Sequence, residues 1–178
     1  KGSIIDNLLE RGADVHVLPH DAPVSTVEAV DPDLVFVSNG PGDPANYGAT
    51  RALVEQVLGE VPIAGICLGM QIVANAVGGE TTKMAFGHRG VNQPVQSLDS
   101  GRVVMTTQNH GYKVADAGTL AVTHRNVNDD TPEGAESTAL DVMTRQYHPE
   151  AHPGPHDTTS FFDDVCSMAV AGAHPATS

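Results

Sequence analysis

The sequence predicts an α/β domain with a doubly wound, mostly parallel open sheet that carries helices on both faces. In the first half of the chain, helical patterns alternate with short apolar runs, an arrangement that needs crossover connections between parallel strands. Glycine- and proline-rich turns separate these segments. A length of 178 residues is enough for one core but not for two, so we interpret residues 1–178 as a single domain.

The elements expected in the first half follow from residue spacing. Apolar residues at helical spacing predict helices over residues 4–11, 51–58 and 67–77. Alternating or continuous apolar runs that stop at proline or glycine predict strands over residues 13–18, 34–37 and 61–66. The third strand leads directly into the third helix, which ends at Gly78 and Gly79.

From Thr81 onward the pattern becomes strand-like. Runs separated by Gly, Asn and Asp predict strands over residues 91–96, 103–108, 120–125 and 141–147. We expect these strands to be antiparallel or mixed and to close an otherwise parallel sheet. A last helix over residues 158–171 places its apolar side chains on one face.

The charge balance excludes some functions. There are 22 Asp and Glu against 9 Lys and Arg, a net charge of −13, so the clustered cations that nucleic acids require are missing. The acidic residues are scattered, which indicates a solvated surface, and a salt-accumulating cytoplasm is our hypothesis for it. No apolar run approaches the roughly 18 residues of a membrane span, and the first residues lack a signal layout. We therefore expect a cytoplasmic protein without membrane or nucleic-acid partners.

Cys67 lies in a Gly-x-Cys-x-Gly bracket, GICLG, where a buried strand turns into a helix. This pattern is typical of a nucleophile elbow, in which glycines allow a cramped backbone and the turn exposes the side chain. The helix N-terminus favours a thiolate and can hold a developing oxyanion. The alternative is a small buried core residue, which is our interpretation of Cys166. We expect both cysteines to be reduced.

A base for this thiol is expected in the segment QYHPE. Pro149 stops the strand, so His148 and Glu150 project from a rigid turn, and Glu150 can orient the imidazole while His148 deprotonates Cys67. A surface turn that merely contains a histidine is the alternative. His148, His152 and His156 recur every four residues, but intervening prolines prevent a helix, so we expect no metal site there.

A glycine-rich turn, SNGPGDP at residues 38–44, lies at the C-terminal end of a predicted strand. It lacks the Lys-Ser/Thr of a phosphate loop and does not open a helix directly. We interpret it as a ligand-binding turn at the edge of a parallel sheet.

Three of these segments, SNGPGDP, GICLGMQ and HPE, together resemble the class I (triad) glutamine amidotransferases and occur in that family's order. Within the family, residues 83–95, 108–112 and 148–157 are similar to the small (glutaminase) subunit of carbamoyl-phosphate synthetase. The resemblance covers essentially the whole chain.

The resemblance implies that Cys67 is the nucleophile, His148 the general base and then acid, and Glu150 the residue that orients His148. The backbone of Gly40 and Leu68 would hold the oxyanion. Further residues would line the glutamine pocket, namely Gly42, Gln71, Asn109, Gly111 and Tyr112. Ammonia would pass to a separate large synthetase subunit that makes carbamoyl phosphate from bicarbonate. ATP and magnesium are expected only on that partner, and no cofactor or metal in this chain.

The chain departs from the family pattern in three places. Met70 stands where the family commonly has His, for which we expect altered packing but not lost chemistry. Residues 128–140 are shortened and polar and are interpreted as a peripheral turn. The family's first, central strand would precede Lys1, so we expect a fragment of a longer subunit that lacks this strand.

Two alternatives remain open at this point. The same hydrolysis could feed another synthase that makes anthranilate, aminodeoxychorismate or GMP, although the segments HPGPHD and GHRG favour carbamoyl phosphate synthesis. The second alternative is a catalytically silent domain that only binds a synthetase. The intact Cys67, His148 and Glu150 argue against this alternative.

Overall fold

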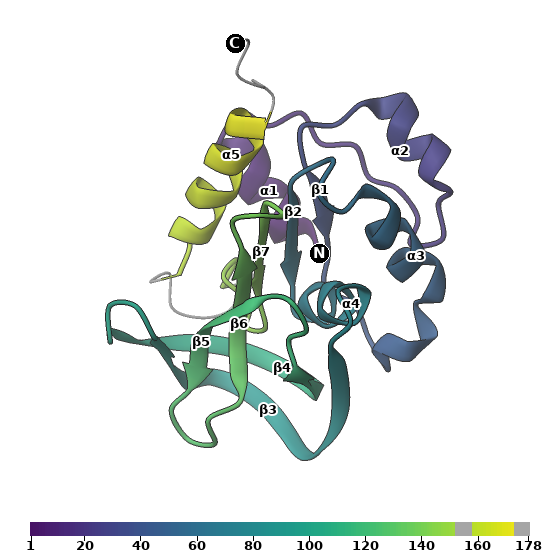
Figure 1. Ribbon diagram of the computed structural model, residues 1–178. Helices are drawn as coiled ribbons and strands as arrows, with labels where there is room; N and C mark the ends of the chain where they lie inside the picture. Colours follow the sequence, from purple (N-terminus) through teal and green to yellow (C-terminus); the bar gives the residue numbers. More distant parts are fainter. Residues whose placement is uncertain (152–157, 173–178) are drawn as a thin grey trace.

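The computed structural model describes residues 1–151 and 158–172. Within them the chain forms one seven-stranded sheet, in the order β1-β2-β7-β6-β5-β3-β4, with helices packed on it (Figure 1). The elements in chain order are α1 (Gly2–Glu10), α2 (Val24–Val30), β1 (Val35–Val37), the 3-10 turn η1 (Pro44–Asn46), α3 (Gly48–Val57), β2 (Ile63–Ile66), α4 (Leu68–Ala76), β3 (Glu80–Ser97), β4 (Val103–Asp116), β5 (Ala121–Asn126), β6 (Pro132–Ser137), β7 (Val142–Arg145) and α5 (Ser160–Gly172).

The parallel half of the sheet consists of β1, β2 and β7. β2 is buried along its whole length and alternates between two cores: Ile63 packs into the core that contains α3 and α4, whereas Ala64 and Ile66 pack into the core that contains α1 and α5. Figure 1 shows the two helix pairs on opposite faces of these strands. The α/β fold with helices on both faces is therefore confirmed.

The other half of the sheet is antiparallel. β6, β5, β3 and β4 continue from β7 through antiparallel pairings only, so the sheet as a whole is mixed. The long β3–β4 ribbon curves away from the parallel half (Figure 1). The strands after Thr81 are mixed, as expected, because β7 lies parallel to β2 whereas β3, β4, β5 and β6 pair antiparallel. The sheet is not mostly parallel as predicted, since its antiparallel part is the larger one.

Two predicted elements are wrong. Residues 13–18 are irregular instead of a strand, because no described strand pairs with them and alternation alone does not make a ladder. Within residues 128–140, expected to be a peripheral turn, lies β6, which pairs with both β5 and β7 inside the sheet. Its polar sequence conceals its burial, since Glu133 is fully buried beside Gly134 and Ala135. Helix α2 was not predicted.

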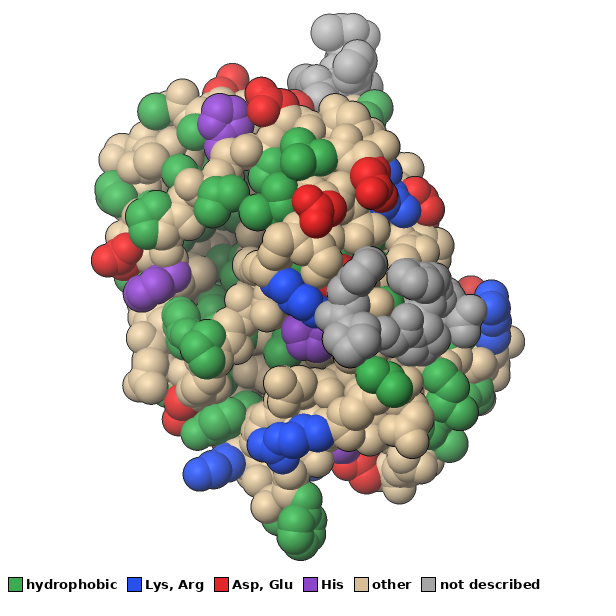
Figure 2. Space-filling model, turned by 180° about the vertical axis from the view of Figure 1, so that it is seen from behind, with side chains coloured by type: hydrophobic (Ala, Val, Ile, Leu, Met, Phe, Trp, Pro, Cys, Tyr) green, Lys and Arg blue, Asp and Glu red, His purple; other side chains and the backbone are tan. Residues whose placement is uncertain are grey.

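The surface carries the acidic excess. Figure 2 shows acidic side chains scattered over one face, which also carries several Lys and Arg side chains. In the part of the chain that the structure describes, every helix is too short or too polar to cross a bilayer.

Candidate active site

Cys67 lies at the junction between β2 and α4. Its backbone N–H still donates to the carbonyl of Arg145 in β7 at 2.8 Å, while its own carbonyl accepts from the N–H of Gln71 at 3.3 Å. The residue thus ends a ladder and begins a helix at once. Because Cys67 is bonded both to the strand ladder and to the first turn of the helix, its backbone adopts φ 56° and ψ −108°. This conformation is strained for a residue with a side chain.

The two glycines of the bracket are required by close backbone contacts. A Cβ at Gly69 would overlap the carbonyl oxygen of Val37 in β1, and a Cβ at Gly65 would lie 3.0 Å from the carbonyl carbon of Gly69. α4 therefore rests directly on the backbone of β1 and β2. The sharp turn at Cys67 depends on this contact, because any longer side chain would push the helix away from the sheet.

His148 and Glu150 follow β7 on the neighbouring strand end. The N–H of His148 donates to the carbonyl of Thr107 at 2.8 Å, and its Nδ1 lies 2.8 Å from Oε1 of Glu150. Both side chains are buried, and Lys1 Nζ contacts the same carboxylate oxygen at 3.1 Å. The turn after the strand therefore holds the imidazole and the carboxylate in one fixed pair.

The titration of this pair follows from its neighbours. Burial lowers the pKa of His148, but hydrogen bonds and charge interactions with Cys67 and Glu150 outweigh it and raise the pKa to about 9. Burial likewise raises the pKa of Glu150, yet the hydrogen bond and charge of His148, with the charge of Lys1, leave it below its ordinary value. At neutral pH His148 is an imidazolium between a carboxylate and the cysteine.

A pocket of about 240 Å³ opens in front of Cys67. Eight residues expected in or beside the glutamine site line it, namely Gly40, Gly42, Cys67, Leu68, Gln71, Asn109, Gly111 and Tyr112. They come from the turn after β1, the start of α4 and the middle of β4. The pocket thus lies where β4, the last strand of the antiparallel half, approaches α4 and the turn after β1.

Two tyrosines fix the glycine-rich turn against the rest of the pocket. Tyr47 Oη donates to the carbonyl of Pro41 at 2.8 Å, and Tyr112 Oη donates to Asp43 Oδ2 at 3.0 Å. The Asp43 carboxylate holds the phenolic proton and so raises the pKa of Tyr112. Gly40 lies against Leu68, where a Cβ would come within 2.6 Å of that side chain. The turn is therefore held in place from both halves of the sheet.

Gln71 presents an amide to the pocket in one defined orientation. Its Nε2 donates to the carbonyl of Tyr112 at 2.9 Å and to Gln146 Oε1 at 3.1 Å. Both protons of the amide nitrogen are used in this way, which leaves its oxygen to accept from a ligand.

The family model for Glutamine amidotransferase class-I matches residues 1–168. The chain belongs to this family. It is 68% identical over 177 residues to the carbamoyl phosphate synthase small chain of Halobacterium salinarum, with 99% of this chain and 50% of the relative aligned. The corresponding small chain of Archaeoglobus fulgidus is 47% identical over 172 residues, which are 94% of this chain and 48% of the relative. The chain thus spans about half the length of these relatives.

A solved structure agrees on the fold. A protein from Thermoplasma acidophilum described as part of a GMP synthase superposes with a TM-score of 0.83 at 17% identity, covering 97% of this chain and 89% of that one. At this identity the likeness shows a shared fold.

Three residues that line the pocket were not among the candidates from the sequence, namely Pro41, Arg89 and His110. Arg89 is the one cation among the lining residues that the structure describes. Only the family resemblance indicates a functional role for its segment, GHRG. His110 belongs to a buried cluster with His88 and Glu133, which come from three different strands, so no local spacing marks them.

The remaining sequence candidates lie elsewhere. Met70 is fully buried in the core that contains α3 and α4 and does not line the pocket. Neither cysteine is in a disulfide. Cys166 lies on α5, where burial raises the pKa of its thiol. Of the spaced histidines, His152 and His156 lie outside the described residues, as does the whole segment HPGPHD.

Proposed function

We propose that this chain hydrolyses the side-chain amide of glutamine through a Cys67 thioester and delivers the ammonia to a synthetase subunit for carbamoyl phosphate synthesis. The observation that carries the proposal is the buried group of Cys67, His148 and Glu150, in which His148 interacts with both of the others. Cys67 also lines a pocket together with the oriented amide of Gln71, whereas His148 and Glu150 are not among the residues that line it. A nucleophile, a base and an orienting carboxylate in this relation form a catalytic triad.

In the first step Cys67 acts as a thiolate whose proton is held by His148 as an imidazolium. The thiolate sulfur attacks the side-chain carbonyl carbon of glutamine, and the carbonyl π electrons move onto the oxygen. The oxygen of the tetrahedral intermediate lies at the start of α4, where the N–H of Leu68 has no acceptor within the helix, and the backbone of Gly40 completes the oxyanion site. His148 gives its proton to the leaving nitrogen, so ammonia departs and a glutamyl thioester remains.

In the second step water replaces ammonia. His148, now neutral, takes a proton from the water, which attacks the thioester carbonyl, and glutamate leaves as the thiol regains its proton. Glu150 keeps Nδ1 of the ring occupied throughout, so Nε2 always faces the reaction.

The wall of the pocket suits an amino acid. The oxygen of Gln71 accepts from the ligand, Gly42, Asn109, Gly111 and Tyr112 surround it, and the Arg89 guanidinium pairs with its α-carboxylate. The names of the relatives support a large synthetase chain as the recipient of the ammonia. ATP and magnesium belong to that partner in this proposal.

The test uses the protein assembled with a carbamoyl phosphate synthase large chain. It compares carbamoyl phosphate formation from glutamine with carbamoyl phosphate formation from ammonia. Cys67→Ser should abolish glutamine-dependent carbamoyl phosphate formation and leave ammonia-dependent formation unchanged, because only the first requires the thiol. Cys166→Ser is the matched control and should leave both intact. Glutamine-dependent synthesis that survives in Cys67→Ser would falsify the assignment of the nucleophile.

A labelling experiment separates the chemistry from the partner. A chloroketone analogue of glutamine should modify Cys67 and spare Cys166, and excess glutamine should protect Cys67. Equal labelling of both thiols would contradict the proposed pocket, whereas selective labelling without carbamoyl phosphate formation would refute only the proposed partner.

A further inference from the structure

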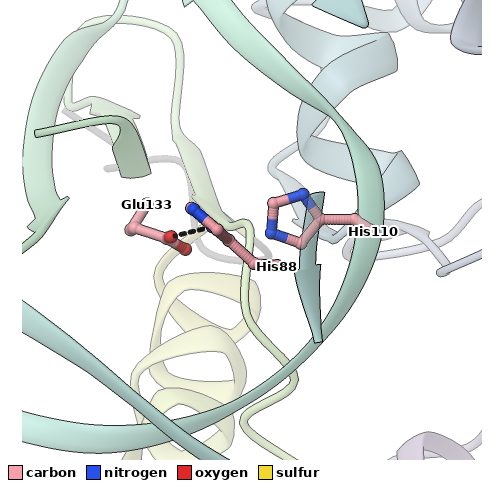
Figure 3. Close-up of side chains that lie close together, drawn as sticks. All are labelled: His88, His110 and Glu133. Carbon is pink, nitrogen blue, oxygen red and sulfur yellow. Dashed lines mark ion pairs between the residues drawn. The ribbon is translucent and has the colours of Figure 1, made fainter. Parts of the chain in front are cut away.

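A buried polar cluster lies behind the glutamine pocket, on the inner face of the curved antiparallel half. His88 in β3 is paired directly across the ladder with His110 in β4, and Gln108 lies two residues before His110 on the same face. Glu133 approaches from β6, as Figure 3 shows. All four side chains are buried, and the ligand-type atoms of the two histidines and Glu133 lie within 4.8 Å of one another.

We propose that this cluster is a binding site for a divalent transition metal ion, with Zn²⁺ the best match to its donors. The ligands are His88 Nδ1, His110 Nε2, the Glu133 carboxylate and Gln108 Oε1. Two imidazoles with carboxylate and amide oxygens are borderline ligands of the kind zinc accepts, and four protein ligands with no open position make a closed, structural site.

The separations between these atoms fit a coordination shell. Gln108 Oε1 lies 3.0 Å from His88 Nδ1 and 2.9 Å from His110 Nε2, and Glu133 Oε1 lies 3.3 Å from His88 Nδ1. Ligands about 2.0–2.1 Å from a metal are about 2.9 Å apart at the corners of an octahedron and about 3.4 Å apart at those of a tetrahedron.

The outward-facing atoms of the ligands are held as in known metal sites. His88 Nε2 donates to Asp129 Oδ2 at 2.9 Å, and His110 Nδ1 donates to the carbonyl of Tyr112 at 2.8 Å. Asn126 Nδ2 donates to Glu133 Oε1 at 3.0 Å. Metal-binding histidines commonly donate their second ring N–H to a carboxylate or a backbone carbonyl in this way, which aims the other nitrogen at the ion.

The orientation of the Gln108 amide is fixed by Thr106. The hydroxyl of Thr106 donates to the carbonyl of Gln93 at 2.8 Å, so it can only accept from Gln108 Nε2, which lies 3.1 Å away. The amide nitrogen of Gln108 therefore faces Thr106, and its oxygen faces the two histidines.

With these orientations, the centre of the cluster holds more hydrogen-bond acceptors than donors. Because the Tyr112 carbonyl can only accept, the proton of His110 is on Nδ1 and a lone pair is on Nε2, which faces the lone pairs of Gln108 Oε1. Glu133 Oε2 is fully buried without a hydrogen bond. A cation among these atoms satisfies them all.

The ion would stabilise the wall of the glutamine pocket. His110 lines that pocket, and the Tyr112 carbonyl accepts from both His110 and Gln71. Asp129, which accepts from His88, also lines a separate surface pocket of about 460 Å³.

The decisive measurement is the zinc content and the zinc affinity of the full-length protein. The protein carries both Cys67→Ser and Cys166→Ser, because its thiols could otherwise bind the ion. We expect one Zn²⁺ per chain in competition with a chromophoric chelator. Glu133→Gln should weaken the affinity at least about tenfold. Glu136→Gln is the matched control, since it removes a carboxylate from the same strand that pairs with Arg145 outside the cluster, and it should not change the affinity.

A second measurement avoids substitutions in the cluster and so remains valid if Glu133→Gln does not fold. Co²⁺ added to the thiol-free protein should give the visible absorption of a site with nitrogen and oxygen ligands, and Zn²⁺ should displace it. Failure of the thiol-free protein to bind either ion, or equal zinc affinity in Glu133→Gln and Glu136→Gln, would overturn the proposal.

Discussion

Replacing Glu150 by Gln tests the electrostatic core of the site, because it keeps the shape of the side chain and removes its charge. The rise of the His148 pKa from 6.5 to about 9 corresponds to about 3 kcal/mol of net stabilisation of the imidazolium. Cys67 and Glu150 share this stabilisation, so neutralising Glu150 should remove about 1.5 kcal/mol, equivalent to about one pH unit. The ring should also lose its fixed orientation, which in catalytic triads costs about 10²-fold or more in rate.

The assay is ammonia release from glutamine as a function of pH. His148 must be protonated to release ammonia, and its pKa is raised, so the rate of the unaltered protein should fall as the pH rises through about 9. In Glu150→Gln this basic limb should move down by about one pH unit. Glu55→Gln, which removes an exposed carboxylate paired with Arg51, is the control. A basic limb that stays in place in Glu150→Gln would refute the electrostatic reasoning.

Three further predictions concern packing, binding and salt. Gly69→Ala should lower the free energy of unfolding, measured by thermal melts, by about 1–3 kcal/mol, because the added methyl group overlaps the Val37 carbonyl. Gly48→Ala is the control and should have little effect, because open space surrounds this position. Arg89→Gln should raise the KM for glutamine about tenfold and leave kcat unchanged; a change in kcat alone would contradict the role in binding the α-carboxylate. Molar KCl should raise the melting temperature, since screening relieves repulsion at a net charge of −13, and an indifferent melting temperature would refute this.

The parallel half of the fold could be predicted from the sequence because its signals are local. β2 is a continuous apolar run buried on both faces, and the glycines around Cys67 mark a turn that only small residues permit. The pairing of His148 with Glu150 follows from two residues and one proline on a single turn. In each case the residues that explain the feature are neighbours in the chain.

The antiparallel half is harder to predict from the sequence, because the hydropathy of its residues does not indicate which of them are buried. β6 contains Pro132, Glu133 and Gly134, a composition typical of a turn, yet it pairs on both sides inside the sheet. Glu133 is buried because polar partners from β3 and β5 surround it. Such a group becomes recognisable only when strands distant in sequence come together, so the cluster around His88 could not be predicted.

The pocket is formed by both halves of the sheet. The parallel half supplies Cys67 and the glycine-rich turn, and the antiparallel half supplies the wall around Tyr112. Among the contacts that join the two halves, three lie near the pocket: Tyr112 Oη to Asp43, Gln71 Nε2 to the Tyr112 carbonyl, and the N–H of His148 to the carbonyl of Thr107. Each contact joins a residue of one half to a residue of the other. A shift of the β3–β4 ribbon would therefore move the ligand wall and the general base together relative to Cys67, which makes the rigidity of the antiparallel half a condition for aligning nucleophile, base and substrate.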